Sequence, residues 1–242
     1  MIEMPSPAGG VDGAMKPKAI VSWSTGKDSA FALQRVREQG QLEVVGILTT
    51  LTAEFGRVSM HGVRESLLDA QARALGLPCH KVLIPFPCPN AVYEQRISEA
   101  LERARAQGVA HVVFGDLFLE DIRAYREAQL APLGLEGVFP VWKEDTALLA
   151  REMVRKQLSA FLTCVDPAKL DGSFVGRCFD LQFLEQLPRD VDPCGENGEF
   201  HTFACSGPMF RESIPVCVGQ TTERDGFVFA DLLPIKKATE SE

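Results

Sequence analysis

Short apolar segments alternate with amphipathic segments through the first 143 residues of this 242-residue chain. We expect strands at residues 19–23, 44–50, 80–84, 111–114 and 137–142, with helices between them at 28–39, 64–75, 91–107 and 121–130. Such alternation with short connections is typical of a parallel sheet covered by helices. The sequence therefore predicts a three-layer α/β fold, and ligands bind such folds at the carboxyl ends of the strands.

The pattern changes after residue 143. We expect a helix at 145–158, a strand at 160–165, a helix at 176–187 and short strands at 199–206, 214–219 and 226–233, with a turn at Asp225-Gly226. We divide the chain into a flexible tail at 1–17, an α/β domain at 18–143, a smaller α+β region at 144–236 and a polar tail at 237–242.

The composition limits where the protein is expected to work and which partners it is expected to bind. The chain has 25 Lys and Arg against 33 Asp and Glu, a net charge of −8, so nucleic acid is an unfavourable partner. The sequence contains no run of about 18 apolar residues, so we expect no membrane-spanning helix. The first residues lack the features of a secretory signal. Seven scattered cysteines, an odd number, indicate reduced thiols. We expect a cytoplasmic protein.

The loop from Ser24 to Ser29, Ser-Thr-Gly-Lys-Asp-Ser, lies between a predicted strand and a predicted helix. Helix N-termini carry free N–H groups and a partial positive charge, which suit a phosphate. We expect Gly26 to allow close approach of the anion and Lys27 to be exposed and to supply a cation. Asp28 either caps the helix or holds Mg²⁺. The alternative is an ordinary capped helix with a surface lysine.

This hexapeptide resembles the Ser-Gly-Gly-x-Asp-Ser signature of the PP-loop ATP pyrophosphatases. The resemblance implies an adenine nucleotide alpha-hydrolase-like fold and cleavage of ATP to AMP and pyrophosphate. Thr25 stands where the signature has its first glycine. Because β-branched residues resist positive φ, we expect ordinary backbone angles at Thr25.

Three further segments, 59–62, 115–116 and 192–202, resemble the diphthine–ammonia ligase family within that superfamily. Their sequences are Ser-Met-His-Gly, Gly-Asp and Asp-Pro-Cys-Gly-Glu-Asn-Gly-Glu-Phe-His-Thr, and the resemblance covers about residues 18–235. It implies that a carboxylate attacks the α-phosphate of ATP and that ammonia then displaces AMP. In eukaryotic and archaeal members the carboxylate belongs to a modified histidine of translation elongation factor two. A bacterial-type member would have another carboxylate substrate.

The resemblance and the loop chemistry together give the candidate site. We expect residues 18–143 to bind ATP through Ser24, Thr25, Gly26, Lys27, Asp28, Ser29, Met60 and Gly115, with Asp28 as a ligand of Mg²⁺. The catalytic candidates are Lys27, Asp116, Glu196, Glu199 and His201. Residues 144–236 would bind the substrate.

Each assignment has a structural alternative. Met60 is equally a core filler, and Asp116 a helix cap. Glu199 and His201 alternate on a predicted strand, so we expect them to converge and to deprotonate ammonium or orient the substrate. The alternative is a turn with solvated glutamates.

Two arginines and two cysteines lie near these motifs. Arg123 and Arg126 would meet a carboxylate or lie on a solvated helix face. Cys194 would carry sulfur or, as we favour, be a buried thiol, and Cys88 has no identifiable activator.

We expect an amide-forming ligase with ammonia and a carboxylate-bearing molecule as substrates, and a homodimer is one option. The alternatives are a PP-loop RNA-modifying enzyme, of thiolation or lysidine type, and a protein that binds ATP or AMP without turnover.

Overall fold

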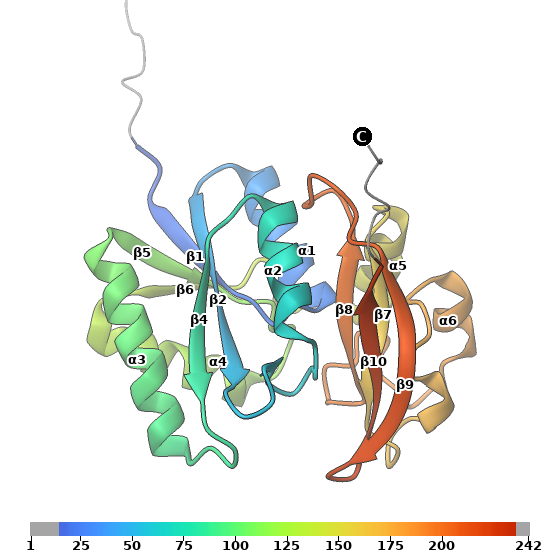
Figure 1. Cartoon of the computed structure of the whole chain (residues 1–242). Coiled ribbons are helices and arrows are strands. Elements are labelled where there is room, and N and C mark those ends of the chain that lie inside the picture. Colours follow the sequence, from blue (N-terminus) through green and yellow to red (C-terminus); the bar gives the residue numbers. More distant parts are fainter. Residues whose placement is uncertain (1–14, 236–242) are drawn as a thin grey trace, which may run out of the picture.

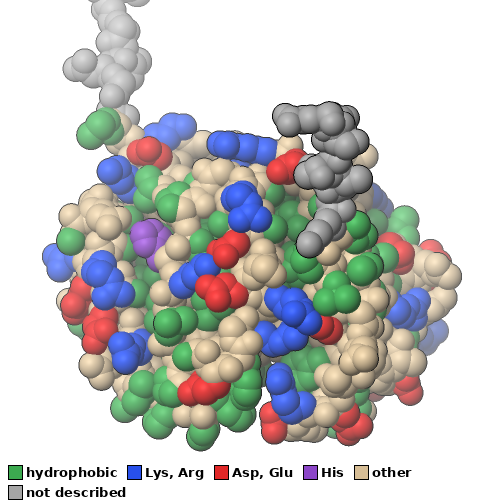
Figure 2. Space-filling view, in the orientation of Figure 1, with side chains coloured by type: hydrophobic (Ala, Val, Ile, Leu, Met, Phe, Trp, Pro, Cys, Tyr) green, Lys and Arg blue, Asp and Glu red, His purple; other side chains and the backbone are tan. Residues whose placement is uncertain are grey.

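The computed structural model describes residues 15–235 and contains two sheets, one in each half of the chain (Figure 1). The polar tail predicted at 237–242 and most of the tail predicted at 1–17 lie outside these residues. Within the described range, none of the helices is long and apolar enough to cross a bilayer. Figure 2 shows basic and acidic side chains interspersed over the face presented there.

The first sheet has five parallel strands in the order β4-β2-β1-β5-β6. They are β1 (Lys18–Ser22), β2 (Glu43–Thr52), β4 (Cys79–Ile84), β5 (Val109–Val113) and β6 (Glu136–Val138). The predicted parallel sheet is confirmed. A sixth strand, β3 (Arg57–Val58), pairs antiparallel with the end of β2 and was not predicted, since two residues carry no periodicity.

Helices cover both faces of this sheet (Figure 1). They are α1 (Lys27–Gln39), α2 (Glu65–Leu75), α3 (Asn90–Ala106) and α4 (Glu120–Leu130), which continues into η1 (Ala131–Leu133). Successive strand residues serve opposite faces: Val21 packs in the core with α1 and α2, whereas Ile20 packs in the core with α3 and α4. Two buried cores on one sheet make the three layers that the alternation predicts.

The second sheet is antiparallel, in the order β8-β7-β10-β9. Its strands are β7 (Ser159–Val165), β8 (Phe200–Ser206), β9 (Val216–Arg224) and β10 (Phe227–Pro234). The helices of this half are α5 (Thr146–Arg155), η2 (Gly172–Phe174) and α6 (Leu181–Gln186). The smaller α+β region is therefore present.

Two predicted elements have only about half of their expected length. The strand predicted at 137–142 ends at Val138, because Pro140 cannot donate a ladder hydrogen bond and the chain turns there. The helix predicted at 176–187 begins only at Leu181, since Gly176 has φ 78° and Cys178 forms a bridge with Phe161 of β7. Tertiary pairing thus overrides local helical preference in that segment.

One continuous hydrophobic core joins the two sheets. It contains Phe31 and Leu33 of α1 together with Phe203 and Ala204 of β8. Asp231 of β10 adds ion pairs to Arg57 and Arg64 of the first half. The second sheet therefore rests against α1 and α2.

The predicted turn between β9 and β10 is confirmed, with φ 53° at Asp225 and φ 82° at Gly226. A Cβ atom at Gly226 would meet no atom within 4 Å, so only the backbone angle resists a side chain there. We expect Gly226→Ala to lower the free energy of unfolding by about 1–2 kcal/mol, measured by urea denaturation. Gly226→Asn is the control and should cost less, because asparagine tolerates the left-handed region. Equal losses for both variants would contradict this explanation.

Candidate active site

A cavity of about 500 Å³ lies at the carboxyl ends of β1, β2 and β5. The candidate site residues that line it come from four segments far apart in the sequence. They are Ser24, Asp28 and Ser29; Ser59, Met60 and His61; Gly115, Asp116 and Arg126; and Glu196 and His201. The chain runs from β1 to one side of the sheet and returns through β5 on the other, so the cavity lies where the strand order reverses. All four segments singled out in the sequence therefore meet here.

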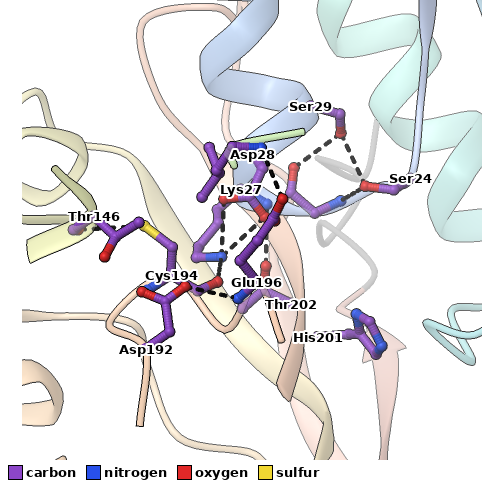
Figure 3. Close-up of polar contacts among 12 residues, drawn as sticks. Ser24, Lys27, Asp28, Ser29, Thr146, Asp192, Cys194, Glu196, His201 and Thr202 are labelled. Atoms are coloured by element: carbon purple, nitrogen blue, oxygen red, sulfur yellow. Dashed lines mark hydrogen bonds and ion pairs between the residues drawn. The ribbon is translucent and has the colours of Figure 1, made fainter. Parts of the chain in front are cut away.

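Helix α1 begins at this cavity without a side-chain cap at Gly26. The Ser24 Oγ accepts a hydrogen bond from the Gly26 N–H at 3.3 Å and lies 3.2 Å from the Ser29 Oγ (Figure 3). Both hydroxyls line the cavity. Two hydroxyl groups and the positive end of an uncapped helix suit an anion.

The expectation of ordinary backbone angles at Thr25 is wrong, because its φ is 72°. The Thr25 carbonyl oxygen accepts from the Gln71 side-chain amide at 2.9 Å and from the Ala204 N–H at 2.9 Å. These two donors hold the peptide in an orientation that a threonine would otherwise avoid. Thr25 itself is fully buried and does not line the cavity.

The expectation of an exposed Lys27 is also wrong, since the residue is 1% exposed. Its ammonium pairs with the Asp28 carboxylate at 2.9 Å and donates to the Cys194 carbonyl (Figure 3). It also lies over the rings of Phe179 and Phe200. Burial lowers the pKa of Lys27, but Asp28 and the other nearby anionic groups outweigh burial and raise it. The charged Lys27 side chain therefore links α1 to the 192–197 loop and does not line the cavity.

Two carboxyl groups line the cavity, those of Glu196 and Asp116. The Glu196 Oε1 accepts from the Leu117 N–H at 2.7 Å, and the Asp116 Oδ2 lies 3.6 Å from the Arg126 Nε. Burial raises the pKa of Glu196 to about 7, and the charges of Asp28 and Asp116 act in the same direction. Burial also raises the pKa of Asp116, against the effect of Arg126. Glu196 can therefore accept or release a proton near neutral pH.

Two histidine rings, His61 and His201, are in tilted contact beside the loop, with centroids 4.7 Å apart and planes at 38°. The His61 Nδ1 lies 3.0 Å from the Thr202 carbonyl oxygen, which makes it the donor. Burial, with the charge of Lys27, lowers the pKa of His61 to about 4. Burial, followed by His61 and Lys27, lowers the pKa of His201 to about 3. Both rings are neutral at pH 7 and act through hydrogen bonds.

The structure does not bring Glu199 and His201 together. Strand β8 begins after Glu199, whose Oε1 accepts from the Asp192 N–H and the Asn197 side-chain amide, both at 3.1 Å. Glu199 thus shapes the loop that carries Glu196, while His201 faces His61. Sequence reasoning placed His61 in a motif without giving it a role, and only its contact with His201 indicates one.

Gly115 and Met60 both line the cavity, for different reasons. A Cβ atom at Gly115 would come within 2.7–2.9 Å of the backbone of Asp28 and Ser29, so only glycine permits this close approach. Met60 is 63% exposed and has φ 62°, which places it at the rim and argues against a core filler.

The two arginines of α4 have different surroundings. Arg126 lines the cavity, lies 5.1 Å from the Phe114 ring centroid and has a buried Nε without a hydrogen-bond partner among the described residues. Arg123 instead stacks on Phe139 and Trp142 and pairs with Glu127. Only Arg126 is available to a molecule in the cavity.

Cys194 is 1% exposed and its thiol donates to the Thr146 carbonyl at 3.4 Å (Figure 3). Burial raises the pKa of this thiol. A protonated, enclosed thiol is a poor nucleophile, so the buried-thiol interpretation is favoured. Cys88 is partly exposed, with its Sγ 3.7 Å from the Pro89 carbonyl oxygen.

The cavity suits ATP together with a divalent cation. Its volume lies in the range of about 300–1,000 Å³ for small-molecule sites, and Leu48, Val58 and Met60 offer apolar surface for a base. In residues 15–235, no three His, Cys, Asp or Glu side chains form a ready-made metal cage. Mg²⁺ usually takes only one or two carboxylates together with phosphates, which Asp28 can satisfy.

Glu196 should make stability depend on pH. Its pKa is about 7 in the folded protein and about 4.3 when unfolded, so the folded state binds more protons between these values. Ionisation of Glu196 therefore removes stability as pH rises through that window. We expect Glu196→Gln to gain stability relative to wild type between about pH 5 and about pH 8, measured from urea midpoints. The two histidines are common to both proteins and cancel; an unchanged difference would show that Glu196 does not titrate in this range.

Comparison with known proteins identifies the family. A family model described as the diphthamide synthase N-terminal domain matches residues 17–136, and one described as its C-terminal domain matches residues 145–240. The diphthine–ammonia ligase of Danio rerio is 25% identical over 233 residues, which are 86% of this chain and 89% of the relative. The protein of the same name from Homo sapiens is 23% identical over 239 residues, covering 89% and 88%. The resemblance drawn from the motifs is confirmed, and the chain belongs to the diphthamide synthase family.

Proposed function

We propose that this protein is an ATP-dependent ligase that joins ammonia to a carboxylate and releases AMP and pyrophosphate. The observation that carries the proposal is that the loop opening α1 and the loop before β8 line one cavity. The relatives named diphthine–ammonia ligase supply the reaction class. From these relatives we infer that the substrates of this protein are ammonia and a carboxylate-bearing molecule.

Bound ATP would supply an activated phosphorus and a pyrophosphate leaving group, and Mg²⁺ would offset their negative charge. The Ser24 and Ser29 hydroxyls and the start of α1 would hold the phosphates, with Asp28 on the metal ion. Met60 at the rim would cover the base. We propose that residues 18–143 provide this nucleotide site and that residues 144–236 complete the substrate site.

Arg126 is our candidate for binding the substrate carboxylate. Arg126 lines the cavity, and its Nε lies 3.6 Å from the Asp116 Oδ2 without a hydrogen-bond partner among the described residues. A planar guanidinium recognises a carboxylate through two parallel hydrogen bonds. Asp116 would keep the guanidinium oriented.

Glu196 is our candidate for the proton transfer. Ammonium must lose a proton before nitrogen can attack a carbonyl carbon, and a carboxylate with a pKa of about 7 can accept that proton at neutral pH. The neutral rings of His61 and His201 would orient the reactants. Lys27 and Glu199 would act indirectly, by holding Asp28 and the 192–197 loop in place.

The other functions have less support. The enclosed Cys194 thiol argues against sulfur transfer to RNA, and the acidic chain against RNA in general. A protein that binds ATP or AMP without turnover has no need for a carboxyl group with a near-neutral pKa such as Glu196. A cytoplasmic location and a homodimer are further proposals from composition and family.

Turnover tests the proposal directly. We expect the protein with ATP, Mg²⁺, ammonium and a suitable carboxylate to release AMP and pyrophosphate in equal amounts, followed by chromatography. The carboxylate panel should include a protein bearing diphthine as well as small acids, and reactions without ammonium are the control. ATP binding without carboxylate-dependent AMP would favour a binding protein, and RNA-dependent AMP would favour an RNA-modifying enzyme.

Arg126→Met should raise KM for the carboxylate by about ten- to a hundredfold, as loss of a charged hydrogen bond of about 1.5–3 kcal/mol implies. Affinity for MgATP should stay nearly unchanged in calorimetry. Arg123→Met is the matched control, one turn away on α4 and outside the cavity, and should leave both values unaltered. A loss of nucleotide affinity with an unchanged carboxylate KM would assign Arg126 to the phosphates instead.

A further inference from the structure

We infer that Gln71 is a positioning residue that holds the turn at Thr25 in its left-handed conformation and so keeps the start of α1 ready for a nucleotide. The nucleotide part of this inference rests on the proposed function. Gln71 belongs to α2 and lies outside every motif recognised in the sequence.

Thr25 occupies an unfavourable conformation without help from its own side chain. Its φ is 72°, in a region that β-branched residues avoid. Its Oγ1 is buried and has no hydrogen-bond partner among the described residues. The conformation must therefore be stabilised by contacts of the backbone.

Gln71 supplies one of the two hydrogen bonds to the Thr25 carbonyl, beside that of the Ala204 N–H, from a fully buried position. Its side-chain nitrogen donates to the Thr25 carbonyl at 2.9 Å and to the Ala204 carbonyl at 2.7 Å. Its side-chain oxygen accepts from the Trp23 indole N–H at 2.8 Å, which sets the orientation of the amide. The Gln71 amide thus uses both donor hydrogens and is locked by a third bond.

The direction of the Thr25 carbonyl decides how the helix begins. The same peptide unit carries the Gly26 N–H, which donates to the cavity-lining Ser24 Oγ. On the other side, the Lys27 N–H donates to the Thr202 Oγ1 of β8 at 3.0 Å. If the Gln71 hydrogen bond is lost, a change of φ at Thr25 relieves the strain there but moves the Thr25 carbonyl and the Gly26 N–H of the same peptide unit.

A rescue experiment separates positioning from general stability. We expect Gln71→Met to weaken MgATP binding about tenfold, which corresponds to about 1.4 kcal/mol, because only part of the population keeps the competent turn. Adding Thr25→Gly should restore affinity to near the wild-type value, since glycine adopts positive φ freely. Adding Thr25→Val should not, because valine keeps the branching of threonine. Calorimetry measures all the affinities.

Gln34→Met is the matched control. Gln34 is a buried glutamine of α1 that bonds Glu38 away from the loop, so this variant should keep the wild-type affinity. If Gln71→Met does not fold, Gln71→Glu replaces it, because its carboxyl still accepts from Trp23 but donates at most one hydrogen. Failure of Thr25→Gly to rescue binding, or equal rescue by Thr25→Val, would overturn the inference.

Urea midpoints test the inference without nucleotide. Thr25→Gly should stabilise wild type more than it stabilises the Gln71→Met protein, where the turn has already relaxed. Equal gains in both backgrounds would overturn the role of Gln71. A wild-type protein that binds no MgATP, yet shows the unequal gains, would remove the proposed function and leave the positioning role intact.

Discussion

The site depends on the packing of residues 24–29, where α1 begins, against strand β8 of the second sheet. The Ala204 N–H meets the Thr25 carbonyl, the Thr202 hydroxyl meets the Lys27 N–H, and the Lys27 ammonium reaches the Cys194 carbonyl. These contacts are buried, where hydrogen bonds are costly to leave unmade. The nucleotide loop is thus shaped by residues almost two hundred positions away in the chain.

This packing also sets the electrostatics of the cavity. Lys27 stays charged inside the protein because Asp28 pairs with it, and its charge helps to keep His61 and His201 neutral. Glu196, brought in by the 192–197 loop, lies among other carboxylates and is only partly ionised near pH 7. Burial, together with the charge of Lys27, therefore leaves two neutral histidine rings and one carboxyl group that can exchange protons near pH 7.

The sequence was informative wherever periodicity or a loop signature extends over several residues. The five parallel strands, the helices on both faces and the Asp225-Gly226 turn are confirmed, and the four motif segments do share one cavity. Prediction failed for β3, for the strand after Val138 and for the helix before Leu181. The two residues of β3 carry no periodicity, and in the other two segments a proline or pairing with a distant strand decides the backbone.

Local chemistry in the chain determined the fold class, the place of the site at the carboxyl edge of the sheet and the residue types available there. The tertiary structure alone decided which side chains point into the cavity. It buried Lys27, turned Glu199 toward its own loop, placed Arg126 at the cavity and Arg123 against aromatic rings, and brought Gln71 and His61 to the site. The reason is physical: burial and hydrogen-bond partners depend on distant segments, and a sequence pattern reports only the neighbours along the chain.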